Sequence, residues 1–323
     1  MTHRRMHWLA ELDGRRIAVE VPATSANLGA GYDCLGLALE LTNRIEVEVR
    51  GWSRGGIELT VDGEGAGELT ADPDNRFVRG LSAALEFARG PLPEGIGWRI
   101  AMTNRVPLAR GLGSSAAATV GGVVAANALI GEALSLQEQL RLATAIEGHP
   151  DNAAAALLGG FVVVGALDGQ PEAIRFDAPR DLRAVVFIPE LRLETSAMRA
   201  VLPERVPRED AVANLGRVAL GVAGLATGRY DLLRALTVDR LHEPYRAEVY
   251  PHLPWLVGAA REAGALGACL SGAGSTVIAF SDSVSTLTRI EAALSAVAAD
   301  RDLPGRVEIV SPRNTGAKVV PAG

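Results

Sequence analysis

Alternating apolar and polar residues predict strands along the first hundred positions of the chain. Residues 45–49 have the sequence Ile-Glu-Val-Glu-Val, the period of two expected of a half-buried strand, and residues 57–61 and 17–21 alternate in a similar way. A helix is predicted after the turn at residues 72–75, running to about residue 89, and a short strand over residues 98–102. The pattern therefore predicts a sheet and at least one helix in this part of the chain.

Helical and buried-strand patterns are interspersed over the rest of the chain. Helices are predicted over residues 114–130, 135–147, 152–158, 208–226, 253–263 and 286–298, and strands over residues 160–164, 184–188, 269–270, 277–280 and 307–310. Because strands and helices do not alternate regularly, the pattern favours an α+β fold over a doubly wound sheet. The length favours two domains, and Gly, Asp and Pro cluster at residues 165–171. We therefore predict an N-terminal domain over residues 14–168 and a C-terminal domain over residues 169–323.

Composition excludes several classes of protein. Apolar residues make up 48% of the chain and charged residues 22%, the balance of a globular protein. The net charge is −6 and no stretch is strongly basic, so no nucleic-acid partner is expected. Two cysteines far apart in the sequence cannot form a disulfide scaffold and favour a reducing compartment. Residues 1–10 lack a signal-peptide pattern and no apolar run is long enough to cross a bilayer, so we predict a cytoplasmic protein without a membrane partner.

The chain is almost free of lysine, and this narrows the possible phosphate chemistry. Lys318 is its only lysine, so nearly all of its basic residues are arginine. The ordinary P-loop needs a lysine before its last serine or threonine, and the protein-kinase fold needs a lysine on a strand. Neither exists here, and Schiff-base chemistry is disfavoured on the same ground.

A glycine-rich stretch, Gly-Leu-Gly-Ser-Ser at residues 111–115, lies directly before an alanine-rich helix. Glycines let backbone N–H groups come close to an anion, and a helix N-terminus favours negative charge. The two serines offer hydroxyl groups to phosphate oxygens, and one of them is a candidate ligand of Mg²⁺. The alternative is a serine that only caps the helix.

The longer pattern Pro-x-x-x-Gly-Leu-Gly-Ser-Ser-Ala-Ala resembles the phosphate-binding motif of the GHMP kinases, the superfamily of galactokinase, homoserine kinase, mevalonate kinase and phosphomevalonate kinase. Residues 147–152 and 270–276 resemble the middle and the third motif of these kinases, in the same order. The resemblance implies the two-domain GHMP kinase fold, with an N-terminal ribosomal-protein-S5-like nucleotide domain and a C-terminal ferredoxin-like α/β sandwich. It also implies ATP and Mg²⁺ as cofactors. The residues it assigns to ATP are Pro107, Leu108, Ala109, Arg110, Gly111, Leu112, Gly113, Ser114, Ser115, Ala116 and Ala117.

Three further segments, residues 22–33, 195–199 and 239–246, resemble the homoserine kinases within this superfamily. This resemblance implies L-homoserine as the acceptor and O-phospho-L-homoserine, on the way to threonine, as the product. It places the substrate ammonium group on Asn27 and Asp33 and the substrate carboxylate on two arginines. The full set of substrate-binding residues that it implies is Asn27, Asp33, His149, Asn152, Thr195, Arg199, Arg246 and Gly272. A homodimer is expected from the resemblance alone.

The charge of the acceptor gives a physical reason for these assignments. A zwitterionic amino acid needs an acid and a base at opposite ends of its pocket, and the planar guanidinium suits a carboxylate. The residues also have simpler explanations. Asp33 could cap a helix that starts at Cys34, and Thr195 could be a helix cap. Arg199 could be a solvated helix residue, and Arg246 could belong to an ion pair between the domains.

Glu147 is the predicted Mg²⁺ ligand, together with Ser114 or Ser115. It would lie at the C-terminal end of its helix, where the dipole disfavours a carboxylate, and a bound cation would explain that position. The alternative is an acid on the surface. Among the other catalytic candidates, Asn152 is predicted to orient the acceptor hydroxyl and Asp151 is a candidate base, while helix capping is the alternative for both.

The remaining expectations concern adenine, two histidines and competing functions. Asn75 and Asn104 are expected near adenine, and His242 and His252 at the periphery. A kinase for another small alcohol and a non-catalytic nucleotide-binding regulator are the alternative functions. Serine hydrolysis by Ser114, His149 and Asp151 is disfavoured because the Gly-x-Ser-x-Gly elbow is missing.

Overall fold

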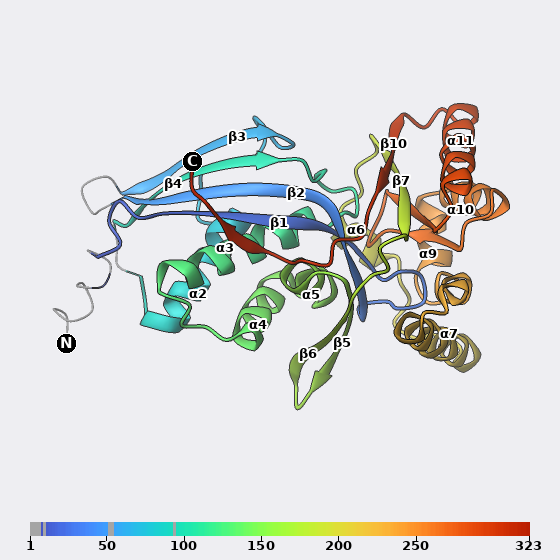
Figure 1. Cartoon of the computed structure of the whole chain (residues 1–323), viewed down its shortest axis with the longest axis horizontal. Helices are drawn as coiled ribbons and strands as arrows, with labels where there is room; N and C mark the ends of the chain where they lie inside the picture. Colours follow the sequence, from blue (N-terminus) through green and yellow to red (C-terminus); the bar gives the residue numbers. More distant parts are fainter. Residues whose placement is uncertain (1–7, 9–10, 51–54, 93–94) are drawn as a thin grey trace.

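The computed structural model describes Trp8 and residues 11–50, 55–92 and 95–323. Most of the N-terminal decapeptide, for which no signal peptide is predicted, lies outside the described residues. The molecule is elongated, with one sheet and its helices toward each end (Figure 1). Among the described residues, no helix combines the length and the apolar character needed to cross a membrane.

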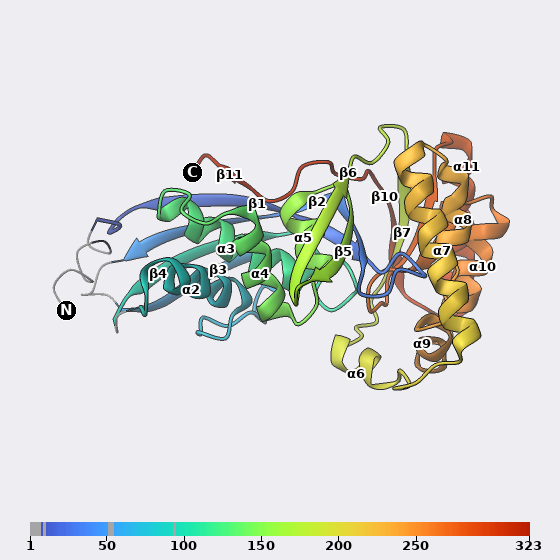
Figure 2. The same cartoon turned by 90° about the horizontal axis from the view of Figure 1, so that it is seen from below.

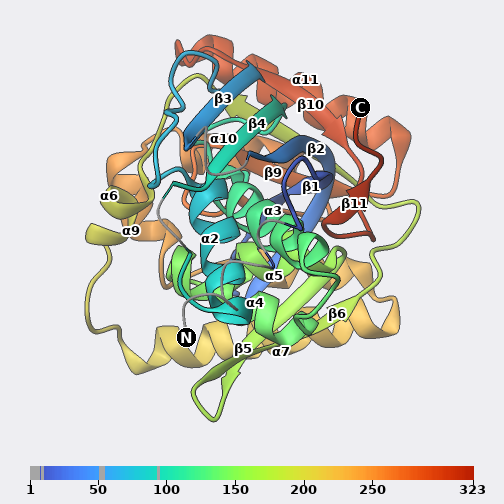
Figure 3. The same cartoon turned by 90° about the vertical axis from the view of Figure 1, so that its left-hand side faces the viewer.

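The first part of the chain builds a large sheet with helices on one face. Its elements are β1 (Arg16–Ala26), β2 (Leu35–Arg50), β3 (Gly56–Gly63), α2 (Arg76–Arg89), β4 (Gly97–Asn104), α3 (Ser114–Leu129), α4 (Leu136–Glu147), α5 (Asp151–Leu158), β5 (Phe161–Leu167) and β6 (Gln170–Phe176). The sheet has seven strands in the order β11-β1-β2-β4-β3, with β5 beside β2 and β6 beside β5. Among the strand pairs of the described residues, only β3 and β4 run parallel, and α2 connects them. Figure 3 shows the helices α2 to α5 covering the same face of this sheet.

Close packing of small residues explains the alanine- and glycine-rich sequence of α3. A Cβ added at Gly122 would lie 2.1 Å from the carbonyl oxygen of Phe77, and one at Gly80 would lie 2.2 Å from that of Thr119. The glycines therefore allow α2 and α3 to approach each other closely. Val21 and Ile45 of the sheet pack beneath them in the same apolar core. This packing fixes the N-terminus of α3, where the glycine-rich loop ends.

The rest of the chain builds a smaller sheet. Its elements are β7 (Arg183–Pro189), α6 (Thr195–Ala200), α7 (Arg208–Thr227), η2 (Tyr230–Leu232), α8 (Leu233–Leu236), α9 (Glu243–Val249), α10 (Leu253–Glu262), β8 (Gly267–Leu270), β9 (Val277–Ser281), α11 (Val284–Asp300), β10 (Gly305–Val310) and β11 (Lys318–Val320). Four antiparallel strands lie in the order β10-β7-β9-β8. Counted along the chain this order is fourth, first, third, second, which is the ferredoxin-like arrangement. The predicted α+β class and its C-terminal sandwich are confirmed.

The two faces of the smaller sheet have different partners. Val185 and Phe187 of β7 pack with α10 and α11, whereas Val186 and Ile188 face the other way. That second face packs against Leu37 of β2 and against α7 and α8. Figure 2 shows α7 and α8 beside the end of the large sheet. One apolar core therefore joins the two sheets and holds the cleft between them.

Some elements differ from the sequence-based expectation. Residues 165–171, the predicted domain boundary, form the tip of the β5–β6 hairpin, with Asp168 and Gly169 both in the left-handed region at φ 51° and 75°. Gly, Asp and Pro mark hairpin turns as well as linkers, so their clustering does not distinguish the two. The large sheet takes β6 and β11 from beyond residue 168. The short elements β6, α6, α9 and β11 and the first half of β2 lack a clear sequence pattern.

Candidate active site

The glycine-rich loop lies between β4 and α3 and is held by its backbone. Thr24 N–H donates to the carbonyl oxygen of Leu112, at 3.0 Å, and Ser271 Oγ donates to that of Gly111, at 2.7 Å. Gly111 and Gly113 have φ of 75° and 70°. A Cβ at Gly113 would lie 1.9 Å from Thr24 Oγ1. The loop therefore needs glycine there, and it packs beside the turn at residues 271–274, as the three motifs predict.

The N-terminus of α3 presents free backbone donors to the cleft. Gly113 is the N-cap residue, and no side chain caps the helix. Within the described chain, the N–H groups of Ser114, Ser115 and Ala116 have no hydrogen-bond acceptor. Both serines lie inside the first turn, so the alternative in which a serine only caps this helix is wrong. Three free N–H groups and the helix dipole form an anion site.

Glu147 ends α4 and points toward the first turn of α3. Its Oε1 accepts hydrogen bonds from Ser115 Oγ at 3.0 Å and from Thr119 Oγ1 at 2.6 Å. The guanidinium of Arg76 lies 3.7 Å away, and the Glu147 side chain is only 3% exposed. The surface-acid alternative is therefore wrong. Ser115, and not Ser114, is the serine that contacts this carboxylate.

The segment between α4 and α5 contributes a hydrogen-bonded cluster. Asp151 Oδ1 lies 2.9 Å from His149 Nδ1 and accepts from the Asn152 N–H at 2.8 Å. The hydrogen bond with Asp151 raises the pKa of His149. Thr24 Oγ1 donates to Asn152 Oδ1 at 2.7 Å. Pro150 occupies the N-cap position of α5, and no side chain caps this helix. Of the backbone N–H groups, Asp151 accepts from that of Asn152, so neither Asp151 nor Asn152 is a conventional cap.

The free groups of this cluster face the cleft. Asn152 and His149 line it together with the glycine-rich loop. No acceptor for the amide nitrogen of Asn152 exists among the residues that the structure describes, so it remains available to a ligand. Among the described residues, no hydrogen bond joins Ser114 to His149, which agrees with the weak case for serine hydrolysis.

Asp33 and Arg199 form a direct ion pair at the side of the cleft. Two parallel hydrogen bonds, at 2.9 and 2.6 Å, join the guanidinium to the carboxylate, and Arg199 also donates to the hydroxyl of Tyr32. Asp33 precedes strand β2 rather than a helix, so the helix-cap alternative is wrong. Arg199 is half-buried and bonded rather than solvated. The acid and the base expected at opposite ends of the pocket are in contact with each other in this structure.

Arg246 lies under the same part of the cleft and is 1% exposed. Its Nη1 donates to the carbonyl oxygen of Gly272 at 2.9 Å and its Nε to that of Met198 at 3.2 Å. Burial lowers the pKa of this guanidinium. None of the carboxylates in the described residues pairs with it, so the predicted alternative of an ion pair between domains is not observed. A buried cation without an anionic partner is costly unless a ligand supplies one.

Asn27 connects these groups through the loop before β2. Its Nδ2 donates to the carbonyl oxygen of Gly272 at 2.9 Å, and its Oδ1 accepts from the Asp33 N–H at 3.0 Å. Both Asn27 and Asp33 have positive φ, of 68° and 55°. The side chain of Asn27 therefore holds the loop in the conformation that directs Asp33 at Arg199.

A second pocket adjoins the first and shares Ser114, Ser115 and Thr195 with it. Asn75 and Asn104, the residues expected near adenine, both line this second pocket. Asn75 also caps α2 by accepting from the Phe77 N–H. The N-cap residue of α6 is Glu194, so Thr195 lies inside the helix and is not its cap.

Arg110 and His242 make contacts that the sequence did not predict. Arg110, assigned to ATP, lines the cleft, and its Nε donates to the carbonyl oxygen of Pro189 at 2.8 Å. His242, expected at the periphery, is fully buried and lies 3.0 Å from Arg246. Sequence reasoning also missed Tyr32 and Thr24. Both lie in the segment 22–33 that resembles the homoserine kinases. The resemblance therefore pointed to this segment, but the sequence-based roles were given to the neighbouring Asn27 and Asp33.

Comparison with known proteins identifies the family. The model of the GHMP kinases N terminal domain matches residues 76–160, and that of the GHMP kinases C terminal domain matches residues 222–300. The chain is 42% identical to a homoserine kinase of Moorella thermoacetica over 94% of this chain and 99% of the relative. It is 43% identical to a homoserine kinase of Corynebacterium efficiens over 92% and 97% of the two chains.

The fold comparison points to the same family. The crystal structure of homoserine kinase from Cytophaga hutchinsonii superposes with a TM-score of 0.84 at 31% identity, covering 94% of this chain and 97% of that one. Sequence identity and fold agree over nearly the full length, and the glycine-rich loop lies within the matched N-terminal domain. The chain belongs to the homoserine kinase family of the GHMP kinases.

Proposed function

We propose that this protein transfers the γ-phosphoryl group of ATP to the hydroxyl of L-homoserine, forming ADP and O-phospho-L-homoserine, a step toward threonine. The observation that carries the proposal is the buried guanidinium of Arg246, which lacks a carboxylate partner among the described side chains. It lines the same cleft as the free N-terminus of α3. A phosphate donor and a carboxylate-bearing acceptor would therefore find complementary groups side by side.

Binding of the zwitterion would replace one ion pair with two. The substrate ammonium group would take Asp33 and its carboxylate would take Arg199 and Arg246. Asp33 and Arg199 neutralise each other in this structure. A ligand that carries both charges would separate them and still leave neither charge unpaired. A sugar or another neutral alcohol offers neither partner, which favours an amino-acid acceptor.

Positioning is the main contribution that phosphoryl transfer requires of these residues. The N–H groups at the start of α3 would hold the phosphates, and Asn75 and Asn104 would lie near adenine in the adjoining pocket. Asn152 would orient the acceptor hydroxyl through its free amide nitrogen. Asp151 is a candidate base, although its Oδ1 already contacts His149 and the Asn152 N–H.

Glu147 and Ser115 are the proposed ligands of Mg²⁺. The donor set fits, because a buried carboxylate and a hydroxyl lie together beside the phosphate site. Mg²⁺ commonly uses one or two protein oxygens and completes its shell with water and phosphate. The described residues contain no group of three His, Cys, Asp or Glu that could hold a metal without phosphate oxygens. The metal would neutralise charge on the transferring phosphoryl group. A homodimer and a cytoplasmic location stay predictions from sequence.

The test is ADP release by the purified protein with ATP and Mg²⁺, measured with L-homoserine, mevalonate, galactose, shikimate and L-threonine. The proposal predicts that kcat/KM for L-homoserine exceeds that for each other acceptor by at least about a hundredfold, since buried charges reject ligands that leave them unpaired. Preference for another alcohol would contradict the proposal. ATP binding without transfer to any acceptor would instead favour a nucleotide-binding regulator.

A further inference from the structure

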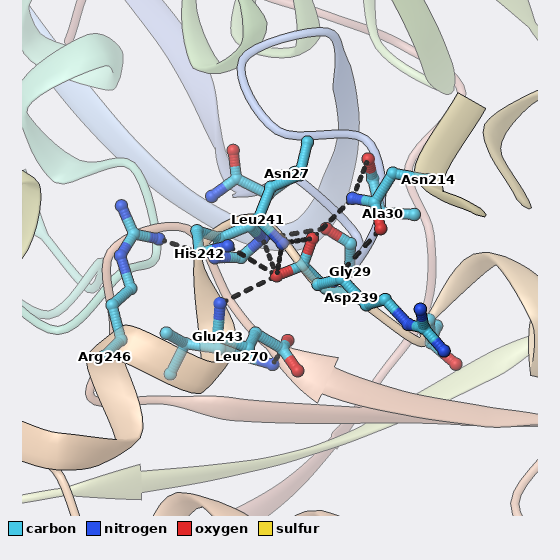
Figure 4. Close-up of polar contacts among 12 residues, drawn as sticks. Asn27, Gly29, Ala30, Asn214, Asp239, Leu241, His242, Glu243, Arg246 and Leu270 are labelled. Carbon is cyan, nitrogen blue, oxygen red and sulfur yellow. Dashed lines mark hydrogen bonds and ion pairs between the residues drawn. The ribbon is translucent and has the colours of Figure 1, made fainter. Parts of the chain in front are cut away.

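The backbone that precedes α9 is fixed by a buried polar network (Figure 4). The carboxylate of Asp239 accepts from the N–H groups of His242 and Glu243, each at 2.7 Å. Asn214 Nδ2 donates to the same carboxylate at 2.6 Å and to the carbonyl oxygen of Ala30 at 3.2 Å. His242 is the residue just before α9, and Arg246 lies one helical turn further on. The network therefore fixes the point from which both side chains project.

The imidazole of His242 has one partner on each side. Its Nε2 lies 2.8 Å from the carbonyl oxygen of Gly29, which can only accept a hydrogen bond. Its Nδ1 lies 3.0 Å from Nη1 of Arg246, which can only donate. The proton must therefore be on Nε2, and Nδ1 must be the acceptor. Burial lowers the pKa of His242, while the carboxylate of Asp239, 3.7 Å from Nε2, acts in the opposite direction. The contact of Nδ1 with a group that can only donate favours the neutral ring.

Three acceptors set the orientation of the Arg246 guanidinium. They are the carbonyl oxygens of Met198 and Gly272 and Nδ1 of His242. Together they occupy Nε and Nη1, whereas Nη2 has no acceptor in the described chain. Figure 4 shows one terminal nitrogen of Arg246 directed at His242 and the other pointing away from the network. Arg246 lines the cleft with Arg199, so the free nitrogen is available to a ligand there.

We propose that His242 is a positioning residue for acceptor recognition, which holds Nη1 of Arg246 and thereby directs Nη2 into the cleft. The inference rests on the proposed function, in which Arg246 binds the carboxylate of the acceptor. Gly29 belongs to the loop that carries Asn27 and Asp33. His242 therefore ties the loop that would bind the ammonium group to the arginine that would bind the carboxylate.

Two substitutions separate the two hydrogen bonds of the ring. His242→Gln keeps a donor near the position of Nε2, so the bond to Gly29 can persist, but it has no acceptor at the position of Nδ1. His242→Asn keeps an acceptor near the position of Nδ1, so the bond from Arg246 can persist, but it loses the donor to Gly29. His252→Gln is the matched control, since His252 does not line the cleft.

The KM for L-homoserine distinguishes the variants. We expect His242→Gln to raise it about 10- to 100-fold, with kcat and the KM for ATP changed less than about threefold, because the lost bond orients a ground-state contact. The rise in His242→Asn should be at least about fivefold smaller, and His252→Gln should retain the wild-type constants. An unchanged KM in His242→Gln, or equal losses of every constant in both His242 variants, would overturn the role of His242.

The tautomer provides a test that does not require a stable variant. Long-range ¹H–¹⁵N spectra of the unmodified protein should show one histidine that is neutral between pH 6 and 8 with its proton on Nε2. A proton on Nδ1 of His242 would overturn the inference. Absence of L-homoserine turnover by the unmodified protein would remove the proposed function, whereas turnover with a normal KM in His242→Gln would remove only the role of His242.

Discussion

The cleft has two parts: a proposed nucleotide part at the start of α3 and a proposed acceptor part around Asp33, Arg199 and Arg246. The binding groups of the two parts contact different partners. At the start of α3 the backbone donors are free in the described structure, and the glycine-rich loop holds them through carbonyl and N–H contacts. In the acceptor part, Asp33 and Arg199 bind each other, and Arg246 is held by carbonyl oxygens and His242. The proposed phosphate site is preformed, whereas the proposed acceptor would have to displace an ion pair.

This difference has a consequence for specificity. Backbone N–H groups at a helix N-terminus can bind the phosphate of any nucleotide that fits. They are uncharged and need no counter-ion while the site is filled with water. Charged side chains that pair with each other reject a ligand that cannot replace both partners. In the proposed function, backbone N–H groups would therefore hold the phosphates, and the charged side chains of Asp33, Arg199 and Arg246 would select the acceptor.

The largest effect should come from Gly113→Ala. The added Cβ would lie 1.9 Å from Thr24 Oγ1, whose hydroxyl orients Asn152, and the residue has φ of 70°. We expect kcat/KM for ATP to fall about a thousandfold, as phosphate and acceptor contacts are both displaced. Gly131→Ala is the control, since its φ is 77° but nothing lies within 4 Å of its added Cβ. It should cost about 1 kcal/mol of stability and leave the KM for ATP unchanged.

A smaller loss is expected from Glu147→Gln, which keeps an acceptor for Ser115 and Thr119 but removes the charge. If Glu147 binds Mg²⁺, kcat should fall about a hundredfold and half-saturation should need about tenfold more Mg²⁺. Titration of activity against Mg²⁺ at fixed ATP measures both, with the exposed Glu209→Gln as control. An unchanged Mg²⁺ requirement would remove Glu147 from the metal site.

Arg199→Ala tests the paired side of the comparison. It should raise the KM for L-homoserine about tenfold and leave the KM for ATP within about twofold, because it removes one of two carboxylate contacts. Arg229→Ala is the matched control, since Arg229 and Asp231 form an equally close but exposed pair. If both variants keep the wild-type KM, the carboxylate assignment fails.

The smallest effect concerns the pH dependence of stability. The hydrogen bond with Asp151 raises the pKa of His149, so the charged form is favoured in the folded protein. Its stabilisation is fully present below the unfolded value of about 6.5 and is lost as pH rises through the raised folded value. His149→Gln should therefore lower Tm more at pH 5.5 than at pH 8.5. Equal shifts at both pH values would contradict this coupling.

The two parts of the cleft also differ in how much of them could be predicted from the sequence. The loop at residues 107–117 and the helix after it were predictable, because glycine spacing and small-residue packing are local in sequence. The acceptor part depends on contacts between distant segments: Asp33 meets Arg199, and Gly29 meets His242, only after the two sheets pack together. His242 was misplaced at the periphery because α9 has seven residues, too few to show a buried face by periodicity.

Helices and strands that depend on distant contacts were also hard to predict from the sequence. Helices α2, α3 and α11 follow clear patterns, whereas β11 is a three-residue strand that pairs with β1 only when the chain returns to the large sheet. The first half of β2 pairs with β5 rather than β4, and the residues that pair there show no alternation of apolar and polar types that would predict a strand. Short elements defined by distant partners have no local signal to predict them.

The most direct test is ³¹P NMR of the products formed from ATP, Mg²⁺ and L-homoserine by the purified protein. A phosphomonoester signal coupled to the γ-methylene protons of homoserine, growing in step with ADP, is the predicted result. ATP hydrolysis to inorganic phosphate alone, or no new phosphorus signal, would contradict the account of an acceptor site built from paired charges.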